Sequence, residues 1–512
     1  TKCTNYKNST LKSREKIYFL ASWKFIGVLI GLLSINNEAA AQDFYWRGDP
    51  GDGVFLNPDS ACSHVADFIN DWNGNKNYTH LRAEYLQPWA YRCKMDVTDN
   101  RGVIVMADSY QGWAFRVGDS CPAGMKENIA TGTCVNIKKQ TGTPSKLSCV
   151  GNPIDVLTGN KFELEIDYEN SGSILLFSRV YNSIDGLWVH NYSTRLEITD
   201  TEVLRVSADG AEAIFTVNGT NITSDVSDLG TLSRYGDAWR YVGSNNETFY
   251  YDMHGRLTRK IFKSGQQLQF SFNGDVTVVT DGLGGSLSFT EDAQHQPLTF
   301  IAPGMSIQYT YNTNNRLSQM SRTQSGITQQ RKFHYEDTRN SSLLTGITDE
   351  RGVRYATWTY DDQGRATSSR HADGAELTQV VYNADGTRKV TNEFGKSTLY
   401  RFVDTAGTKR VSAIEGEPSA NCPASNSTFT YNDRGQVLTQ TDAKGFITTY
   451  TYNDRGLETT RTQASGTPQA RTTTTTWHAT FNLPLTVTEG GQVTTYTYDS
   501  QGRQTSRTQT AL

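Results

Sequence analysis

Residue types that commonly carry out chemistry are present in this chain, but they do not stand in the patterns that chemistry requires. The eight histidines are scattered, and neither His-Glu-x-x-His nor Gly-x-Ser-x-Gly occurs. Gly395-Lys396-Ser397 resembles the end of a phosphate-binding loop, but Val390 occupies the position of its first glycine. Arg47-Gly48-Asp49 is an adhesion-type tripeptide followed by a proline. We expect turns at both places, and we predict that the chain is not an enzyme and has no catalytic or cofactor-binding residues.

A metal site is not expected either. Asp71, Asn73 and Asn75 have the spacing of the first ligands in an EF-hand calcium loop, but Lys76 and Arg82 replace its glycine and its glutamate. The cysteines lack both the Cys-x-x-Cys spacing and the histidine partners of a zinc site. We therefore predict no metal ligands.

Cysteine usage suggests disulfides. Cys3 lies in the N-terminal segment, and of the other six cysteines all except Cys422 fall between residues 62 and 149. Cys121 and Cys134 enclose a loop that contains glycine and proline, and we predict a bridge between them. Closing this loop would contribute about 3 kcal/mol through chain entropy. The sequence leaves the other pairings open, namely those of Cys62, Cys93, Cys149 and Cys422.

Residues 1–41 are predicted to be a signal peptide. Basic residues precede the apolar run Phe25–Ile35, and Ala39-Ala40-Ala41 provides a small-residue cleavage site before Gln42. The run is too short to cross a bilayer as a helix, which takes about 20 residues, and no other run approaches that length. We therefore predict cleavage between Ala41 and Gln42, a secreted or cell-surface location, and no transmembrane span in the mature chain.

Composition excludes disorder and argues against nucleic-acid binding. Aromatic residues make up 11% of the chain and charged residues only 20%, so the chain has the material to fold. Without the first 41 residues the formal net charge changes from −4 to −8, and no basic block remains to attract nucleic acid. The abundance of Tyr, Phe, Thr and Gly favours a mainly β fold with many turns.

The chain divides into regions of different composition. Residues 43–147 contain four tryptophans and most of the cysteines, and we predict a Cys/Trp-rich N-terminal domain whose polar end, 138–148, is a linker. Beyond it, short alternating segments separated by turn signals predict strands. We place an opening β domain at 150–245 and a repeat array at 246–512.

The array repeats the pattern Tyr-Asp/Asn-x-x-Gly-Arg in clear and looser copies. Its motif residues are Tyr251, Gly255, Arg256, Tyr311, Arg316, Tyr360, Gly364, Arg365, Tyr431, Gly435, Tyr452, Gly456, Tyr498, Gly502 and Arg503. An Asp or Asn that opens a turn, and a Gly that closes it at positive φ, are typical of hairpins. Each unit is therefore predicted to be a hairpin-like pair of strands.

The unit from Tyr431 to Tyr452 sets the expected geometry. Two turns would separate strands at 436–441 and 446–452, with Tyr450 and Tyr452 on one face. A single hairpin cannot bury such a face, whereas stacked hairpins can. We interpret these tyrosines as an aromatic ladder that holds neighbouring repeats together. The alternative interpretation is a surface on which sugars stack.

A second set of motifs precedes the repeats: Gly151–Asp155, Thr158-Gly159-Asn160, Arg179–Ser183 and Gly186–Tyr192. In this order, motifs and repeats resemble the Rhs family, also called YD-repeat proteins. The family includes bacterial polymorphic toxins, the C-components of insecticidal Tc toxins, and teneurins. The resemblance covers about residues 151–512. It implies a β-sheet that spirals into a hollow shell and encloses a C-terminal toxin.

The chain departs from the family pattern in two respects. Its only Asp-Pro pair is Asp49-Pro50, upstream of the repeats, so we assign to the chain neither the self-cleavage that family cores carry out near their end nor a toxin activity. No variable toxin domain follows the repeats, and we expect the array to be incomplete, because repeat arrays need capped ends.

These observations predict a structural function: an exported β-shell segment that encloses or presents a toxin or other polypeptide. The expected partners are the remainder of an Rhs shell or an enclosed polypeptide cargo. The alternative function is a carbohydrate-binding or adhesion module for cell-surface glycans.

The signal segment gives a first testable prediction. Exported protein should begin at Gln42, because Ala39 and Ala41 occupy the small-residue positions of a signal-peptidase site. N-terminal sequencing of exported protein checks this. A mature chain that retains residues 25–35 would contradict it.

Overall fold

The computed structural model describes residues 45–49, 58–72, 76–87, 90–99, 101, 103–117, 125–128, 133–136 and 138–512, the last range with gaps at 171, 200, 225–227, 406, 417–425 and 501. The predicted cleavage site at Ala41 and Gln42 lies outside these residues, and so do the side chains of Cys121 and Cys134. The chain forms two compact units with a boundary between residues 137 and 138.

The first unit contains helix α1 (Pro58–Trp72) and a four-stranded antiparallel sheet in the order β1-β4-β3-β2. Its strands, with a following hairpin, are β1 (Tyr45–Asp49), β2 (Lys76–Gln87), β3 (Ala90–Asp99), β4 (Ile104–Val117), β5 (Met125–Asn128) and β6 (Thr133–Asn136). A disulfide joins Cys62 on α1 to Cys93 on β3, and both cysteines are fully buried. The turn expected at Arg47-Gly48-Asp49 is wrong, because these residues belong to β1 and pair with β4.

The second unit opens with three small sheets. Two short strands pair, β7 (Cys149–Val150) and β8 (Ile154–Asp155). A three-stranded sheet has the order β11-β10-β9, and a four-stranded sheet runs from β12 to β15. Their strands are β9 (Phe162–Glu169), β10 (Leu176–Asn182), β11 (Leu187–His190), β12 (Arg195–Ile198), β13 (Glu202–Val206), β14 (Glu212–Asn218) and β15 (Asn221–Ser224).

The expected linker at 138–148 is not a linker. The side-chain amide of Gln140 donates to the carbonyl of Lys409 at 2.8 Å and accepts from the N–H of Lys409 at 2.9 Å. Thr141 and Ser148 are buried. The polar composition of this stretch therefore serves hydrogen bonding within the second unit.

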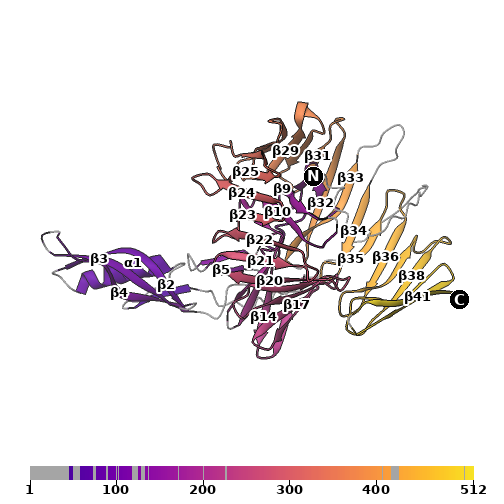
Figure 1. The fold of residues 1–512 in the computed structure, drawn as a ribbon, viewed down its shortest axis with the longest axis horizontal. Coiled ribbons are helices and arrows are strands. Elements are labelled where there is room, and N and C mark those ends of the chain that lie inside the picture. Colours follow the sequence, from indigo (N-terminus) through magenta and orange to yellow (C-terminus); the bar gives the residue numbers. More distant parts are fainter. Residues whose placement is uncertain are drawn as a thin grey trace, which may run out of the picture. The chain divides into compact units, whose positions relative to one another are not determined.

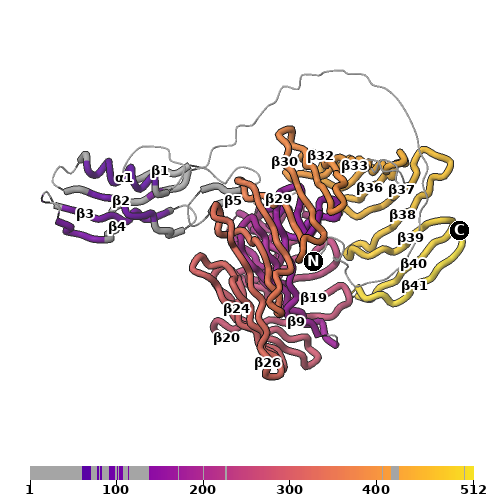
Figure 2. The backbone as a smooth tube through the Cα atoms, turned by 90° about the horizontal axis from the view of Figure 1, so that it is seen from above, coloured from indigo at the N-terminus to yellow at the C-terminus, as the bar shows by residue number. Residues whose placement is uncertain are grey.

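All later strands form one antiparallel sheet of 26 strands in sequence order. Figures 1 and 2 show this succession along the chain. Its strands are β16 (Thr231–Tyr235), β17 (Ala238–Val242), β18 (Thr248–Tyr251), β19 (Leu257–Ile261), β20 (Gln267–Asn273), β21 (Val276–Thr280), β22 (Ser286–Glu291), β23 (Pro297–Ala302), β24 (Met305–Tyr311), β25 (Leu317–Gln324), β26 (Ile327–His334), β27 (Gly346–Thr348), β28 (Arg354–Tyr360), β29 (Ala366–His371), β30 (Thr378–Tyr382), β31 (Arg388–Thr391), β32 (Ser397–Thr405), β33 (Thr408–Gly416), β34 (Ser427–Tyr431), β35 (Val437–Thr441), β36 (Ile447–Tyr452), β37 (Glu458–Gln463), β38 (Arg471–Trp477), β39 (Pro484–Glu489), β40 (Gln492–Tyr498) and β41 (Gln504–Ala511).

The large sheet coils, because residues far apart in sequence hydrogen-bond across it. The side chain of Asn246 accepts from the N–H of Asn482 at 2.6 Å and donates to its carbonyl at 2.8 Å. The predicted fold class is confirmed. It is mainly β, with hairpin-type repeats in one large sheet, and a small domain that contains a disulfide precedes the sheet in the sequence.

We call the face of this sheet that carries the repeat tyrosines the inner face. Between β20 and β31 it packs against residues 150–193, which we call the inner segment and which include β8 to β11 (Figure 1). In the described part of the chain, no helix combines the length and the apolar character needed to cross a membrane.

The cysteines give a second testable prediction. Cys149 is disulfide-bonded. We still expect Cys121 to pair with Cys134, because their loop is short and contains glycine and proline. Peptide mapping without reduction should find the Cys62–Cys93 and Cys121–Cys134 pairs. A peptide that links Cys149 to Cys121 or to Cys134 would contradict the prediction.

Candidate functional site

The candidate site is a corner that recurs at every repeat, which we call the YD corner: the repeat tyrosine, the Asp or Asn after it, and the turn that follows. At Asn432 the side-chain oxygen accepts from the N–H groups of Arg434 at 3.0 Å and Gln436 at 2.9 Å. The N–H of Gly435 closes the turn on the carbonyl of Asn432 at 2.8 Å. Equivalent side chains accept backbone N–H groups at the other corners, namely Asp252, Asn312, Asp361, Asn453 and Asp499.

The glycine of the corner is required by backbone conformation. Gly435 has φ +73, a region in which side chains are strained, and an added Cβ would lie 2.2 Å from the Arg410 guanidinium. The corner at Tyr311 has Asn315 in this place, with φ 55, and asparagine is one of the residues that tolerate this region.

The tyrosine of the corner binds the strand before it. Its hydroxyl donates to a backbone carbonyl of the preceding strand at 2.6 to 2.8 Å in six copies. The pairs are Tyr311 with Pro297, Tyr360 with Leu344, Tyr382 with Ala366, Tyr431 with Val411, Tyr452 with Val437, and Tyr498 with Pro484. The hydroxyl of Tyr251 instead lies 3.0 Å from that of Thr194. Sequence reasoning expected a ladder of rings, and it missed this hydrogen bond.

A register shift accompanies the tyrosine. Pairing with the following strand slips by one residue at the tyrosine, for example between Thr430 and Tyr431 and between Thr451 and Tyr452. Such bulges re-aim a side chain. We infer that the bulge directs each ring toward the preceding strand, so that one residue contacts both of its neighbours.

The arginine of the motif has two uses. Arg256, Arg365 and Arg503 pair with the capping aspartate of their own corner. These pairs are largely exposed and contribute little to stability. At the corner with neutral Asn312, Arg316 instead donates to the carbonyls of Asp185 at 3.2 Å and Gly186 at 2.9 Å. That arginine therefore fastens the sheet to the inner segment.

The corner tyrosines differ in burial. Tyr251 and Tyr360 are buried, whereas Tyr311, Tyr382, Tyr431, Tyr452 and Tyr498 are half-buried. The ladder interpretation expects Tyr450 and Tyr452 to be buried, and the structure shows both to be half-buried. The inner segment packs against strands that precede these two tyrosines.

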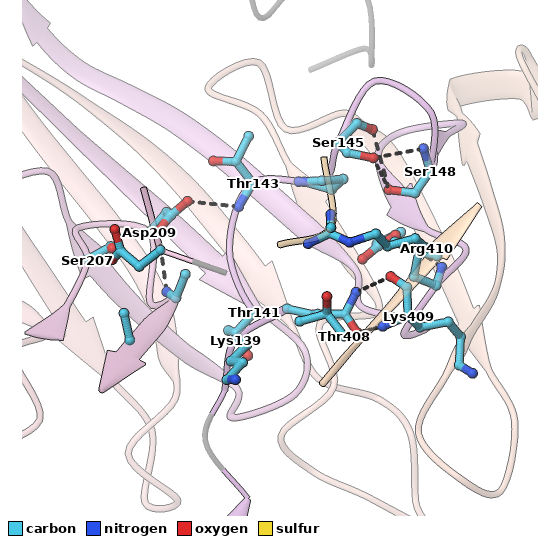
Figure 3. A pocket seen from close by; sticks show the side chains of 18 of the residues that line it. Lys139, Thr141, Thr143, Ser145, Ser148, Ser207, Asp209, Thr408, Lys409 and Arg410 are labelled. Carbon is cyan, nitrogen blue, oxygen red and sulfur yellow. Dashed lines mark hydrogen bonds between the residues drawn. The ribbon is translucent and has the colours of Figure 1, made fainter. Parts of the chain in front are cut away.

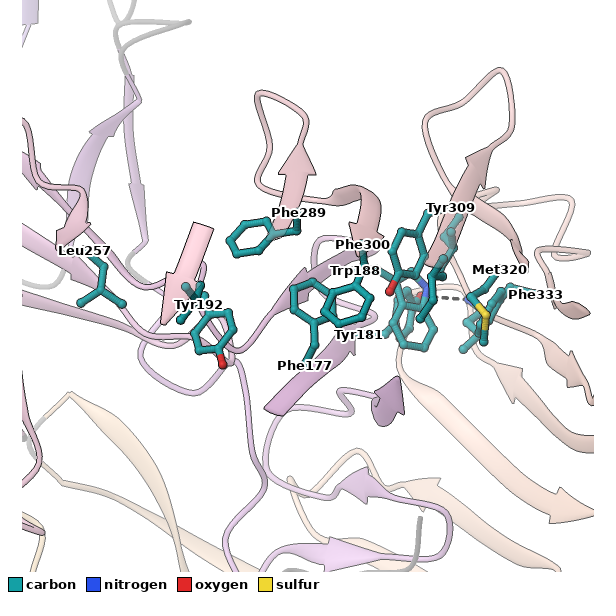
Figure 4. Packing of buried hydrophobic residues seen from close by; sticks show 14 of the residues in the cluster. Phe177, Tyr181, Trp188, Tyr192, Leu257, Phe289, Phe300, Tyr309, Met320 and Phe333 are labelled. Carbon is teal, nitrogen blue, oxygen red and sulfur yellow. Dashed lines mark hydrogen bonds between the residues drawn. The ribbon is translucent and has the colours of Figure 1, made fainter. Parts of the chain in front are cut away.

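The inner segment contacts the sheet through aromatic rings. Phe177 lies 4.7 Å from Phe300 and 5.4 Å from Phe289 between ring centroids. The Trp188 ring meets Phe333 edge-on at 4.9 Å. Figure 4 shows these rings of the inner segment facing rings of the large sheet. Such pairs add about 1 kcal/mol each beyond the area that they bury.

A buried row of charges lies beside these rings. β9 presents Glu163, Glu165 and Asp167 at alternating positions, and all three are buried. Their cationic partners are Lys161 for Glu163, Arg331 for Glu165, and Arg179 for Asp167. The hydroxyls of Tyr355 and Tyr309 also donate to Glu165 and Asp167, at 3.0 and 2.7 Å. Each carboxylate is therefore paired, as buried charges must be.

Burial shifts the pKa values in this interface. Burial raises the pKa of Glu165. The nearby Arg331 charge favours the carboxylate and offsets this rise only in part. Burial also lowers the pKa of Lys161 to about 8, although Glu163 favours the charged form. For Arg179, burial alone would lower the pKa, but the charge of Asp167 outweighs it and the pKa rises.

A histidine–glutamate contact ties the end of the inner segment to the sheet. His190 is fully buried, and its Nε2 lies 2.7 Å from Glu291, whose other oxygen lies 2.8 Å from His295 Nδ1. Burial would raise the pKa of Glu291, but the two histidine contacts dominate and lower it. Among the described residues, no group of three or more His, Cys, Asp and Glu is placed to hold a metal ion.

Two family models match the chain. The model described as "RHS Repeat" matches residues 431–468, a range that begins at a YD corner. The chain therefore contains an Rhs repeat. The expected family resemblance is thereby confirmed, and the same corner recurs from β18 to β41. A second model, described as "Domain of unknown function (DUF6531)", matches residues 151–215, which include most of the inner segment.

Solved structures give distant likenesses. The crystal structure of TcdB2-TccC3 is 13% identical over 84% of this chain and 24% of that chain, with a TM-score of 0.30. The crystal structure of TcdB2-TccC3-Cdc42 is 12% identical over 65% of this chain and 19% of that one, also at 0.30. A porin-like protein from Bacteroides uniformis is 12% identical over 58% of this chain and 94% of that one, at 0.15. The chain thus spans at most about a quarter of the TcdB2-TccC3 chains. No curated protein matches it.

The corner hydroxyl gives a third testable prediction. Tyr452→Phe removes only the hydroxyl that binds the Val437 carbonyl, so local stability should fall by about 1 kcal/mol, or roughly fivefold in opening. Tyr450→Phe is the matched control, because Tyr450 shares the strand and face and makes no hydroxyl hydrogen bond within the described residues. Limited proteolysis within 430–500 measures the difference. Equal cleavage rates for the two variants would contradict the prediction.

Asp155 gives a fourth prediction, on pH. Burial raises the pKa of its carboxyl from 3.8 to about 6, against hydrogen bonds from the Leu157 N–H and the Thr158 hydroxyl. Because the folded chain holds this proton more tightly than the unfolded chain, ionisation destabilises the fold as pH rises from about 4 to 6. Above pH 6 the free energy of unfolding is lower by about 3 kcal/mol than below pH 4.

Asp155→Asn should therefore be more stable than the wild-type chain at pH 8 and should lose that advantage below pH 4. Urea unfolding followed by tryptophan fluorescence at both pH values measures the gap. A gap of the same size at pH 4 and pH 8 would show that Asp155 does not titrate in this way.

Proposed function

We propose that the chain is an exported, structural segment of an Rhs shell that encloses or presents a polypeptide. The observation that carries the proposal is the state of the inner face. Most of it is buried between β20 and β31, whereas from β34 on most of it is only half-buried within the described part of the chain. The half-buried residues are Tyr431, Tyr450, Tyr452, Trp477, Leu485, Tyr496 and Tyr498.

A polypeptide fits this uncovered part of the face. Leu438 lies there and is 37% exposed, and Tyr431 and Tyr450 on the two neighbouring strands are half-buried. Exposed apolar surface marks interaction sites where it is contiguous. The inner segment is a precedent within the same chain, since its aromatic and paired charged side chains cover the equivalent face of earlier strands. A cargo or a further part of a shell would cover β34–β41 in the same way.

Export is part of the proposal. The basic residues, the apolar run and the small-residue site before Gln42 support it. The Cys62–Cys93 disulfide adds support, because disulfides persist in oxidising compartments. The proposal assigns no reaction to the chain, and any toxin activity would reside in the enclosed polypeptide.

Site-specific crosslinking tests the proposal. A photo-crosslinking amino acid is placed at Leu438 on the inner face or, as the matched control, at Ile447 on the opposite face of the neighbouring strand. The two side chains are similarly exposed, at 37% and 40%. In the producing cell, Leu438 should crosslink to a polypeptide and Ile447 should not. Equal crosslinking at both positions, or none at Leu438, would contradict enclosure. Binding of neutral surface glycans that is lost with Tyr452→Ala while the fold persists would favour the alternative, a glycan-binding module.

A further inference from the structure

A polar cavity of about 570 Å³ lies within the second unit, and Tyr431, at the start of the uncovered inner face, is one of its lining residues. Three segments line it: residues from 139–157, from 205–244 and from 408–437. The paired amide contacts between Gln140 and Lys409 hold the first and third segments together. Hydroxyl groups are frequent in its wall, and Figure 3 shows several of them, at Thr141, Thr143, Ser145, Ser148, Ser207 and Thr408.

The carboxylates of the cavity already have donors from the chain. Asp209 accepts the N–H of Thr143 at 3.0 Å, and Glu212 accepts that of Lys138 at 2.8 Å. Asp228 accepts the N–H of Gly230 at 2.6 Å and the hydroxyl of Tyr241 at 3.0 Å. Asp155 accepts from the Leu157 N–H and the Thr158 hydroxyl. None of the four is left needing a cation.

Arg410 is different. Its side chain is half-buried in the cavity wall and lies against Gly435 of a YD corner. Its Nε is buried without a hydrogen-bond partner, and within the described residues its guanidinium makes no hydrogen bond or ion pair. Burial lowers the pKa of Arg410. The nearby Tyr431 raises it and offsets this decrease only in part. A second guanidinium in the wall, that of Arg205, also has a buried Nε without a partner.

The unused hydrogen-bond donors of the cavity therefore belong to a guanidinium group. The best acceptor for a guanidinium is a planar carboxylate, which it binds through two parallel hydrogen bonds. A group that concentrates two charges, such as a phosphate, fits poorly, because four carboxylates line the same wall. The hydroxyls suit a ligand rich in hydroxyl groups, and the ring of Tyr431 lines the cavity beside Arg410. The volume is in the range of small-ligand sites.

We propose that this cavity binds a carboxylated sugar, that is, a uronic acid unit of an acidic oligosaccharide. Arg410 holds the sugar carboxylate, the Ser and Thr hydroxyls exchange hydrogen bonds with the sugar hydroxyls, and Tyr431 flanks the ring. Gly435 is part of the site because any side chain there would displace the guanidinium. The site does not depend on the enclosure of a polypeptide.

Calorimetric titration of the full chain with digalacturonate and trigalacturonate tests the proposal. Both should bind, and the neutral galactose oligomers of equal length should bind at least tenfold more weakly. Arg410→Gln should weaken digalacturonate binding at least tenfold. Arg401→Gln is the matched control, because Arg401 lies on the neighbouring strand and makes an exposed pair with Glu415. It should leave binding unchanged.

Further variants and ligands keep the test decisive. If Arg410→Gln lowers the thermal unfolding midpoint, Arg410→Lys replaces it, since it keeps the charge and loses only the two-pronged geometry. Absence of uronate binding by the wild-type chain would overturn the proposal, as would equal binding by the Arg410 and Arg401 variants. A short peptide with a free C-terminal carboxylate that binds as tightly as digalacturonate would overturn the assignment to a sugar.

Discussion

A single-layer antiparallel sheet has two faces. Exposing an apolar face to water costs free energy. The rest of this structure depends on how that constraint is met. The inner segment, residues 150–193, covers the sheet from β20 to β31 with aromatic rings such as Phe177 and Trp188, and its three buried carboxylates on β9 are all paired. Where this cover ends, the same face carries the same residue types but is only half-buried.

The YD corner explains how so many strands can follow one another with little core of their own. Each corner closes its turn with one Asp or Asn, and six of the tyrosines add a hydrogen bond to a carbonyl that precedes their own strand. Each such bond is worth only about 1 kcal/mol, so no single corner holds the sheet. Repeats that contact only their neighbours share stability along the array, and damage spreads to adjacent units. The long-range amide pairs, Asn246 with Asn482 and Gln140 with Lys409, add fixed points where the coil meets itself.

Local patterns in the sequence predicted local structure well. The Tyr431 unit was expected to form strands at 436–441 and 446–452, and the structure has β35 at Val437–Thr441 and β36 at Ile447–Tyr452. The sequence pattern does not predict which residues far apart in the chain contact each other. The Cys62–Cys93 pair, the carbonyl acceptors of the tyrosines and the contacts of Gln140 depend on which strands the coil brings together, and composition says nothing of that. The polar stretch 138–148 looked like a linker because several of its hydrogen-bond partners are 40 to 269 residues away, from Gly142 with Asn182 to Gln140 with Lys409.

Hydrogen–deuterium exchange of the intact chain, followed by mass spectrometry, tests most directly whether cover of the inner face sets the stability of the sheet. The backbone pairing is continuous from β16 to β41, so pairing alone would protect the amides of interior strands about equally. If cover sets stability, backbone amides in β20–β31 should exchange slowly. Those in β35–β39, where the inner segment gives no cover, should exchange at least tenfold faster. Equal protection in these two groups of strands would contradict it.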